Sequence, residues 1–155
     1  MSLRVGLGVD AHAFADGVPL VLGGVRFESP RGLAGHSDGD VITHALIDAV
    51  LGAAGLGDIG SLFPSDASTP AGISSLDLLQ DAVAQVRGAG YEVVNADCIL
   101  IGEEPRIADR RDELGEVLGA IVGAPVSVRA TTTDGLGFTG RREGLAAQAV
   151  ALVSG

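Results

Sequence analysis

The 155-residue sequence contains no lysine and only one cysteine, Cys98. A single cysteine excludes an internal disulfide and a zinc site built from several thiolates. The absence of lysine excludes a P-loop, in which a lysine contacts the phosphates. The sequence also lacks a run of about 18 or more apolar residues and a basic segment followed by an apolar signal segment. We therefore expect a cytoplasmic protein that neither crosses a membrane nor is secreted.

Positive charge is scarce as well. Twenty acidic residues against ten arginines give a net charge of −10. This balance argues against sequence-independent binding of nucleic acid, which depends on basic patches. Phosphate groups would have to be bound by arginine, metal ions, helix N-termini or the backbone amides that the 24 glycines expose. The length and the 46% apolar content are those of one globular domain.

Apolar periodicity predicts strands that alternate with helices. Strands are expected over residues 3–9, 91–101 and 125–132, with a short hairpin or bulged strand over 18–27. Helices are expected from Ser37 to the glycines at 55 and 57, from Ser74 or Ser75 to Gly88, over 106–122, and over the alanine-rich residues 144–153. Residues 57–72 are rich in turn formers and predict a long ordered loop. This order predicts an α/β (α+β) fold in a single domain over residues 1–155, with helices packed on one face of a mixed four-stranded sheet.

All three histidines lie within the first 44 residues, beside acidic and glycine-rich motifs. Asp10 and His12 are two residues apart at the expected end of the first strand, so their side chains point to the same side. Neutral imidazoles and a carboxylate suit Zn²⁺, and three protein ligands leave a fourth position open, as in catalytic zinc sites. The set Asp10, His12 and His44 therefore predicts a catalytic metal site.

The residues around His44 and His36 leave several roles open. Asp40, His44 and Asp48 follow one another at intervals of four, so either aspartate could hold the second nitrogen of the His44 ring. Asp38 and Asp40 are interpreted as helix-capping charges without substrate contact. His36 could be a fourth ligand, could support the helix start, or could contact a phosphate. Cys98 is expected to be an inert core residue.

Five motifs follow one another along the chain: Asp10-x-His12, His36-Ser-Asp-Gly-Asp-x₃-His44, Gly57-Asp-Ile-Gly60, Phe63-Pro64, and Thr131-Thr-Thr-Asp-Gly-Leu-Gly-Phe-Thr-Gly-Arg141-x-Glu143-Gly144. With them the sequence resembles 2-C-methyl-D-erythritol 2,4-cyclodiphosphate synthase from about Arg4 to Leu152. The resemblance implies a homotrimer with active sites between subunits. It also implies conversion of 4-diphosphocytidyl-2-C-methyl-D-erythritol 2-phosphate to the cyclic diphosphate with release of CMP, in the non-mevalonate route to isoprenoids.

The resemblance also implies roles for individual residues. Asp10, His12 and His44 would bind Zn²⁺ or another divalent transition metal, and Asp134 would bind Mg²⁺ or Mn²⁺ between the substrate phosphates. His36 and Thr132 would stabilise the transition state. Substrate contacts are implied for Asp10, His12, His36, Ser37, Asp58, Ile59, Gly60, Phe63, Pro64, Ser65, Asp66, Gly102, Glu103, Glu104, Pro105, Arg106, Ile107, Ala108, Thr131, Thr132, Thr133, Asp134, Phe138 and Arg141. An isoprenoid diphosphate in a central cavity of the trimer, near Phe138 and Arg141, is implied as a further ligand. The sequence departs from the family at Asp134, Gly135 and Ser65, where glutamate, lysine and aspartate are common.

Two other functions fit the same residues. A zinc-dependent phosphoester hydrolase could use the three ligands to hold a hydroxide nucleophile. A non-catalytic trimer could bind the metal or a nucleotide without turnover. In the cyclisation, one phosphate attacks another, so the protein must mainly neutralise charge and align the two groups rather than remove a proton.

Overall fold

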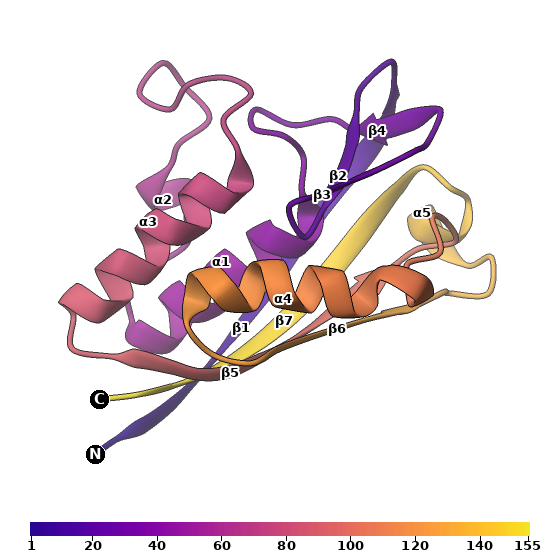
Figure 1. Ribbon diagram of the computed structural model, residues 1–155. Coiled ribbons are helices and arrows are strands. Elements are labelled where there is room, and N and C mark those ends of the chain that lie inside the picture. Colours follow the sequence, from indigo (N-terminus) through magenta and orange to yellow (C-terminus); the bar gives the residue numbers. More distant parts are fainter.

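The computed structural model describes residues 1–155 as a curled five-stranded sheet with helices on one face (Figure 1). The strand order is β4 (Arg31–Leu33), β1 (Leu3–Asp16), β7 (Gly144–Ser154), β5 (Glu92–Ile101) and β6 (Val126–Thr131). β5 and β6 are parallel, and the other neighbours are antiparallel. The sheet is therefore mixed, as predicted, but has five strands instead of four. β2 (Leu20–Leu22) and β3 (Val25–Phe27) form the predicted hairpin as a separate two-stranded sheet.

Three predicted helices are present. They are α1 (Val41–Ala54), α3 (Ser75–Gly88) and α4 (Arg111–Val122), the last preceded by a short 3₁₀ turn at Ala108–Arg110. Two helical turns, α2 (Ile59–Leu62) and α5 (Gly137–Gly140), were not predicted, because each is only four residues long and lies in a turn-rich segment. None of the helices has both the length and the apolar content that crossing a bilayer requires.

The helix predicted over residues 144–153 is wrong, because this segment is β7. It pairs with β1 on one side and with β5 on the other, so both edges of its backbone are hydrogen-bonded. Its burial has the period of a strand, with Ala147, Ala149 and Ala151 buried and Gln148 and Val150 exposed. The helix propensity of alanine is a weak preference that such long-range pairing overrides. β7 is the central strand of the sheet. Together with β4 it is one of two strands of this sheet that the prediction lacked, because the hairpin predicted over residues 18–27 forms a separate sheet.

Helix α1 packs unusually close to the sheet at two glycines of β1. A Cβ atom at Gly6 would overlap the carbonyl oxygen of Ala49, and one at Gly8 would overlap that of Ala45. Gly6, Gly8, Asp10 and His12 alternate along β1, so all four lie on the face toward α1. The same close approach therefore places His44, next to Ala45, opposite Asp10 and His12.

The N-terminus of α1 is held by Asp40, which is fully buried. Its Oδ1 accepts hydrogen bonds from the amides of Gly23 (2.9 Å) and Thr43 (3.1 Å). Its Oδ2 accepts from the Gly24 amide (2.7 Å) and the Thr43 hydroxyl (2.6 Å). Asp40, and not Ser37, is thus the N-cap, and it also fixes the β2–β3 turn to the helix. Cys98 is buried, as expected, and burial raises the pKa of its thiol to about 12.

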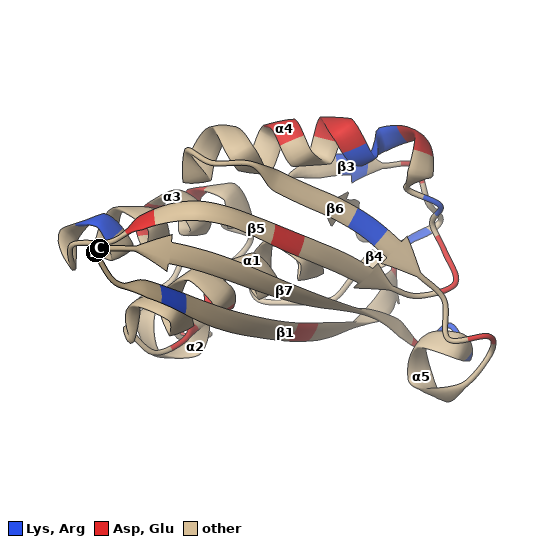
Figure 2. Cartoon of the chain, turned by 90° about the horizontal axis from the view of Figure 1, so that it is seen from below, with Lys and Arg blue, Asp and Glu red and all other residues tan.

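The face of the sheet opposite the helices carries exposed apolar side chains. Figure 2 shows β7 without charged residues between β1 and β5. Leu3, Val5, Leu7 and Val9 of β1 are 55–68% exposed, and Val150 of β7, which pairs with Leu7, is 45% exposed. β7 contains no charged residue. An apolar area of this kind on a protein surface marks an interaction site rather than a solvated face.

The close contact at Gly8 predicts opposite effects for two glycine-to-alanine substitutions. Gly8→Ala should lower the free energy of unfolding by about 1–3 kcal/mol or more, because the helix backbone must move away from β1. Gly52→Ala, at an exposed position of α1 where a Cβ meets only ordinary contacts, should raise it by up to about 1 kcal/mol. Urea denaturation measures both values. Equal effects of the two substitutions would contradict the assigned role of Gly8.

Candidate metal centre and substrate cavity

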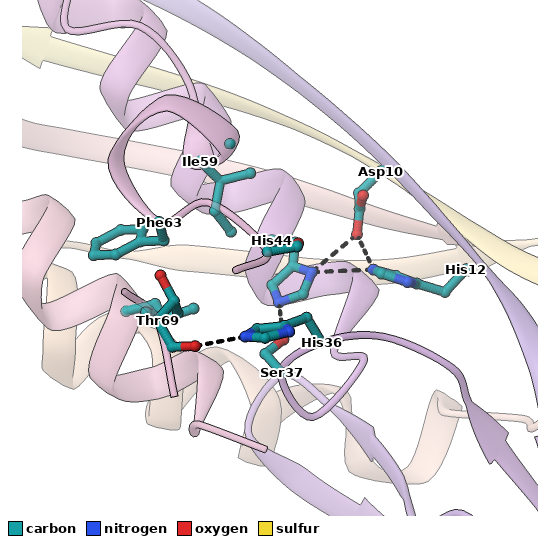
Figure 3. A pocket seen from close by; sticks show the side chains of 11 residues that line it. Asp10, His12, His36, Ser37, His44, Ile59, Phe63 and Thr69 are labelled. Atoms are coloured by element: carbon teal, nitrogen blue, oxygen red, sulfur yellow. Dashed lines mark hydrogen bonds and ion pairs between the residues drawn. The ribbon is translucent and has the colours of Figure 1, made fainter. Parts of the chain in front are cut away.

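A cavity of about 180 Å³ lies between β1, the start of α1, the 57–72 loop that contains α2, and α3 (Figure 3). Its lining includes the three predicted metal ligands together with His36 and Ser37 from the segment before α1. The other lining residues come from the 57–72 loop, α2 and α3: Ile59, Gly60, Phe63, Ser65, Thr69 and Leu78. Two segments that are far apart in the sequence, the histidine motifs and the loop, thus form one cavity.

Asp10, His12 and His44 present three ligand atoms to one point. The Asp10 Oδ2 lies 2.8 Å from His12 Nε2 and 3.1 Å from His44 Nδ1, and the two nitrogens are 3.1 Å apart. Bonds of about 2.0–2.2 Å in a tetrahedral arrangement place ligand atoms about 3.3 Å apart. The triangle therefore fits a small divalent ion, and the donor set of two imidazoles and one carboxylate is one that zinc uses in catalytic sites.

The electrostatics of these side chains favour close association with a cation. Partial burial opposes ionisation of Asp10, but hydrogen bonds with His12 and His44 outweigh it and leave the pKa of this carboxyl below its ordinary value. The hydrogen bond with Asp10 raises the pKa of His12, against the opposing effect of burial. Asp10 is therefore charged near neutral pH and faces two nitrogen ligands, which is the charge pattern of a metal site.

The second nitrogen of His44 is held by two serines. Its Nε2 lies 2.8 Å from the Ser75 hydroxyl oxygen and 2.9 Å from that of Ser37. The prediction that Asp40 or Asp48 holds this nitrogen is wrong. Asp40 is engaged at the helix N-terminus, and Asp48 accepts a hydrogen bond from the Ile59 amide at 2.7 Å.

His36 is attached to the opposite wall of the cavity. Its Nε2 lies 2.6 Å from the Thr69 carbonyl oxygen and donates to it, and its own carbonyl accepts from the Gly72 amide at 2.7 Å. His36 is not part of the group of ligand atoms around Asp10. Its Nδ1 is the ring nitrogen left to contact a ligand in the cavity.

The 57–72 loop brings part of its predicted substrate residues to the cavity. Asp58 caps α2 by accepting from the Ser61 amide at 2.8 Å, and the Asp48 contact ties the adjoining Ile59 to α1. Ile59, Gly60, Phe63 and Ser65 line the cavity, whereas Asp58, Pro64 and Asp66 do not.

The remaining predicted substrate residues form a second group at the ends of β5 and β6. Because these strands are parallel, residues 102–108 and 131–135 leave the sheet at the same edge. The Gly102 amide donates to the Thr131 carbonyl (3.0 Å), and the Gly135 amide donates to Glu103 Oε1 (3.0 Å). Arg106, Ile107 and Ala108 line a small pocket there with Arg111 and Ala130. None of this second group lines the cavity around Asp10.

The second group also contains Thr132, Asp134 and the turn that follows. Asp134 adopts a left-handed backbone conformation (φ 53°), and its amide lies 3.3 Å from the Thr132 hydroxyl oxygen, which accepts from it. Phe138 is 44% exposed, and Arg141 pairs with Glu143 at 2.6 Å. One chain therefore carries two separate halves of the predicted site.

Three residues in or beside the cavity were missed from the sequence. Thr69 and Leu78 line it, and Ser75 contacts His44 while being fully buried. Ser75 was considered only as a helix cap, but Ser74 is the N-cap and its side chain makes no capping bond. A buried serine at the first position of a helix needs a polar partner. This requirement could have indicated that Ser75 contacts another polar side chain.

Comparisons with known proteins give one family. A sequence model of the YgbB family matches residues 3–154. The 2-C-methyl-D-erythritol 2,4-cyclodiphosphate synthase of Rubrobacter xylanophilus is 55% identical over 156 residues, which cover 97% of this chain and 94% of that protein. Among solved structures, a CDP-bound 2C-methyl-D-erythritol-2,4-cyclodiphosphate synthase superposes with a TM-score of 0.87 at 35% identity, covering 97% of this chain and 100% of that one.

A CDP complex of the Plasmodium falciparum protein IspF superposes with a TM-score of 0.84 at 29% identity, covering 98% of this chain and 96% of that one. The matches extend over both groups of predicted site residues and over the whole sheet. The chain therefore belongs to the YgbB family, the family of the 2-C-methyl-D-erythritol 2,4-cyclodiphosphate synthases.

Proposed function

We propose that the chain, as one domain over residues 1–155, converts 4-diphosphocytidyl-2-C-methyl-D-erythritol 2-phosphate to 2-C-methyl-D-erythritol 2,4-cyclodiphosphate and releases CMP. The observation that carries this proposal is the triangle of Asp10, His12 and His44 ligand atoms in a cavity that His36 and Ser37 also line. Membership of the YgbB family and the CDP-bound relatives support the same reaction. Its cytoplasmic location stays a prediction.

The main obstacle in this reaction is that one anionic phosphate must approach another. A divalent ion held by Asp10, His12 and His44 would neutralise charge and polarise a phosphate oxygen. Zinc is our choice because two imidazoles and a carboxylate are its usual catalytic ligands. The chain has a net charge of −10 and no lysine, and no arginine lines the cavity. A bound cation would therefore supply the positive charge that the phosphates need there.

The residues of the metal cavity hold the methylerythritol phosphate end of the substrate. The Ser37 oxygen lies 2.9 Å from His44 Nε2, and its hydroxyl can donate to a phosphate oxygen when it accepts from the ring. His36 is anchored at Nε2 and presents Nδ1 to the same ligand. Ile59 and Phe63 supply apolar contact for the methylerythritol end, and Gly60 and Ser65 lie beside them. Holding this end in place aligns the attacking phosphate and lowers the entropic part of the barrier.

The diphosphate and the cytosine belong to the second group of residues. Thr132 would stabilise the transition state there, and Asp134 would hold Mg²⁺ or Mn²⁺ between the phosphates. Residues 102–108 offer backbone groups and the Arg106 pocket to cytosine. This second group does not line the metal cavity of its own chain. We therefore propose that the second group of a neighbouring copy completes the site at each metal cavity.

This arrangement requires an oligomer, and we propose a homotrimer. The exposed apolar face of β1 and β7, defined by Leu3, Val5, Leu7, Val9 and Val150, supports burial between copies. Leu7 of β1 and Val150 of β7 are register partners, so the apolar side chains of this face lie on neighbouring strands. We also propose that an isoprenoid diphosphate can occupy the central cavity near Phe138 and Arg141.

The cyclisation predicts a specific product. Purified protein with zinc and magnesium should release one CMP for each substrate consumed and yield a cyclic diphosphate, because the attacking phosphate belongs to the substrate itself. Phosphorus NMR and chromatography of the nucleotide measure both products. A linear diphosphate product would instead support a zinc-dependent hydrolase, and full metal binding without any product would support a non-catalytic binding module.

Two substitutions separate metal binding from transition-state stabilisation. His12→Ala should abolish stoichiometric zinc binding and turnover together, because it removes one of three ligands. Thr132→Ala should keep the zinc and lower kcat by roughly 10²-fold, the usual effect of removing one group that stabilises developing charge. Thr132→Ser, which keeps the hydroxyl, is the control. Metal analysis and steady-state kinetics measure these effects, and equal loss of zinc in both alanine variants would refute the division.

A charge on the apolar sheet face should separate the copies. Val5→Asp is expected to give monomers with little turnover, because a desolvated carboxylate opposes burial of the face and the site then lacks its second group. Ala84→Asp, on the exposed side of α3, is the matched control and should leave the oligomer intact. Analytical ultracentrifugation measures the mass. A fully active Val5→Asp monomer would show that one chain suffices.

A further inference from the structure

We propose that Asp38 and Ser75 are positioning residues that fix the proton of the His44 ring on Nε2 and thereby leave Nδ1 free to bind a metal ion. This inference rests on the proposed metal function of Asp10, His12 and His44. Neither Asp38 nor Ser75 contacts the group of ligand atoms itself. The two residues act on the metal site only through the imidazole of His44.

The proposal begins with the contacts of Asp38. Its Oδ1 accepts from the Ser75 hydroxyl, and its Oδ2 accepts from the Ser75 amide at 2.9 Å. The Asp40 amide donates to Oδ1 at 3.1 Å. A carboxylate only accepts hydrogen bonds, so the single hydroxyl hydrogen of Ser75 is directed to Asp38.

This direction determines what Ser75 offers to His44. The Ser75 oxygen lies 2.8 Å from His44 Nε2, and its only hydrogen already points to Asp38, so it can only accept from the ring. His44 must therefore carry a hydrogen on Nε2. Ser75 is fully buried, with 0% of its surface exposed, and His44 is 6% exposed. Water therefore does not compete for the hydrogen bond between them.

The hydrogen on Nε2 also determines the state of the Nδ1 atom of His44. A neutral imidazole has one N–H, so with the hydrogen on Nε2 the Nδ1 atom carries a lone pair. This Nδ1 atom lies 3.1 Å from the Asp10 carboxylate oxygen, and a cation bound between these two acceptors relieves their repulsion. The fixed tautomer thus leaves His44 ready for a metal ion and removes the cost of choosing between tautomers when the ion binds.

The contact of Ser37 is compatible with this assignment but does not determine it. Its oxygen lies 2.9 Å from His44 Nε2, and its hydroxyl is not committed to another protein acceptor, so it could donate or accept. Only Ser75 is tied to a carboxylate. The direction of the whole chain of hydrogen bonds is therefore set by Asp38 and Ser75.

The test uses Ser75→Ala, Ser75→Thr and Ser74→Ala in the full-length protein. Ser75→Ala removes the hydroxyl, Ser75→Thr keeps it, and Ser74→Ala makes the same change one residue earlier, where the side chain makes no capping bond. Cobalt(II) titrations followed by visible absorption give the affinity. We expect Ser75→Ala to weaken cobalt binding by about 10–100-fold, the usual effect of losing a partner of a metal-bound histidine. Ser75→Thr should restore most of the affinity, and Ser74→Ala should match the parent protein.

A second measurement needs no substitution. Long-range ¹H–¹⁵N NMR of the metal-free protein, well above the ordinary imidazole pKa, reports which nitrogen of His44 carries the hydrogen. We expect the Nε2–H form in the parent protein and in Ser74→Ala, and a mixture of both forms in Ser75→Ala. The Nδ1–H form in the parent protein would overturn the proposal even if Ser75→Ala fails to fold, and so would unchanged cobalt affinity in a folded Ser75→Ala. If the parent protein binds no cobalt, the proposed metal function fails, whereas the NMR result still decides the tautomer.

Discussion

The close packing of α1 against β1 is the contact on which the site depends. Gly6 and Gly8 allow the helix backbone to approach the strand, and no residue with a Cβ fits there without moving the helix. Asp10 and His12 continue the same face of β1, and His44 lies beside the Ala45 carbonyl that Gly8 meets. The distance of 3.1 Å between Asp10 Oδ2 and His44 Nδ1 is thus a consequence of how two glycines pack. The packing of the core therefore positions the three side chains that can bind a metal ion.

The three histidines divide between the two sides of the cavity. His12 and His44 converge with Asp10, whereas His36 is hydrogen-bonded to the Thr69 carbonyl across the cavity. In the proposed reaction, the loop that carries Thr69 orients the His36 ring toward the substrate. The second group of residues, at the ends of β5 and β6, stands apart from this cavity in one chain. In the proposed trimer, burial of the exposed apolar sheet face would bring another copy's second group to this cavity.

Local patterns in the sequence were sufficient to identify Asp10, His12 and His44 as a group that can hold a metal ion, and to predict the hairpin and the core of α3. They failed where long-range contacts decide. The alanine-rich segment over residues 144–153 has helix propensity, but pairing with β1 and β5 on both sides makes it a strand. The partner of His44 also escaped prediction, because Ser75 is 31 residues away and only the packing of α3 on α1 brings it to the ring. Asp40 and Asp48 lie at helical spacing from His44, but their carboxylates accept hydrogen bonds from backbone amides instead.

We expect one metal ion, whose position follows from the packing of α1 and whose ligand atom on His44 follows from the contact with Ser75. A crystal structure of the zinc-loaded protein with anomalous scattering at the zinc edge tests this most directly. We expect one peak bonded to Asp10 Oδ2, His12 Nε2 and His44 Nδ1, with His44 Nε2 still on the Ser75 hydroxyl. A peak at other residues, or one bonded to His44 through Nε2, would contradict the account.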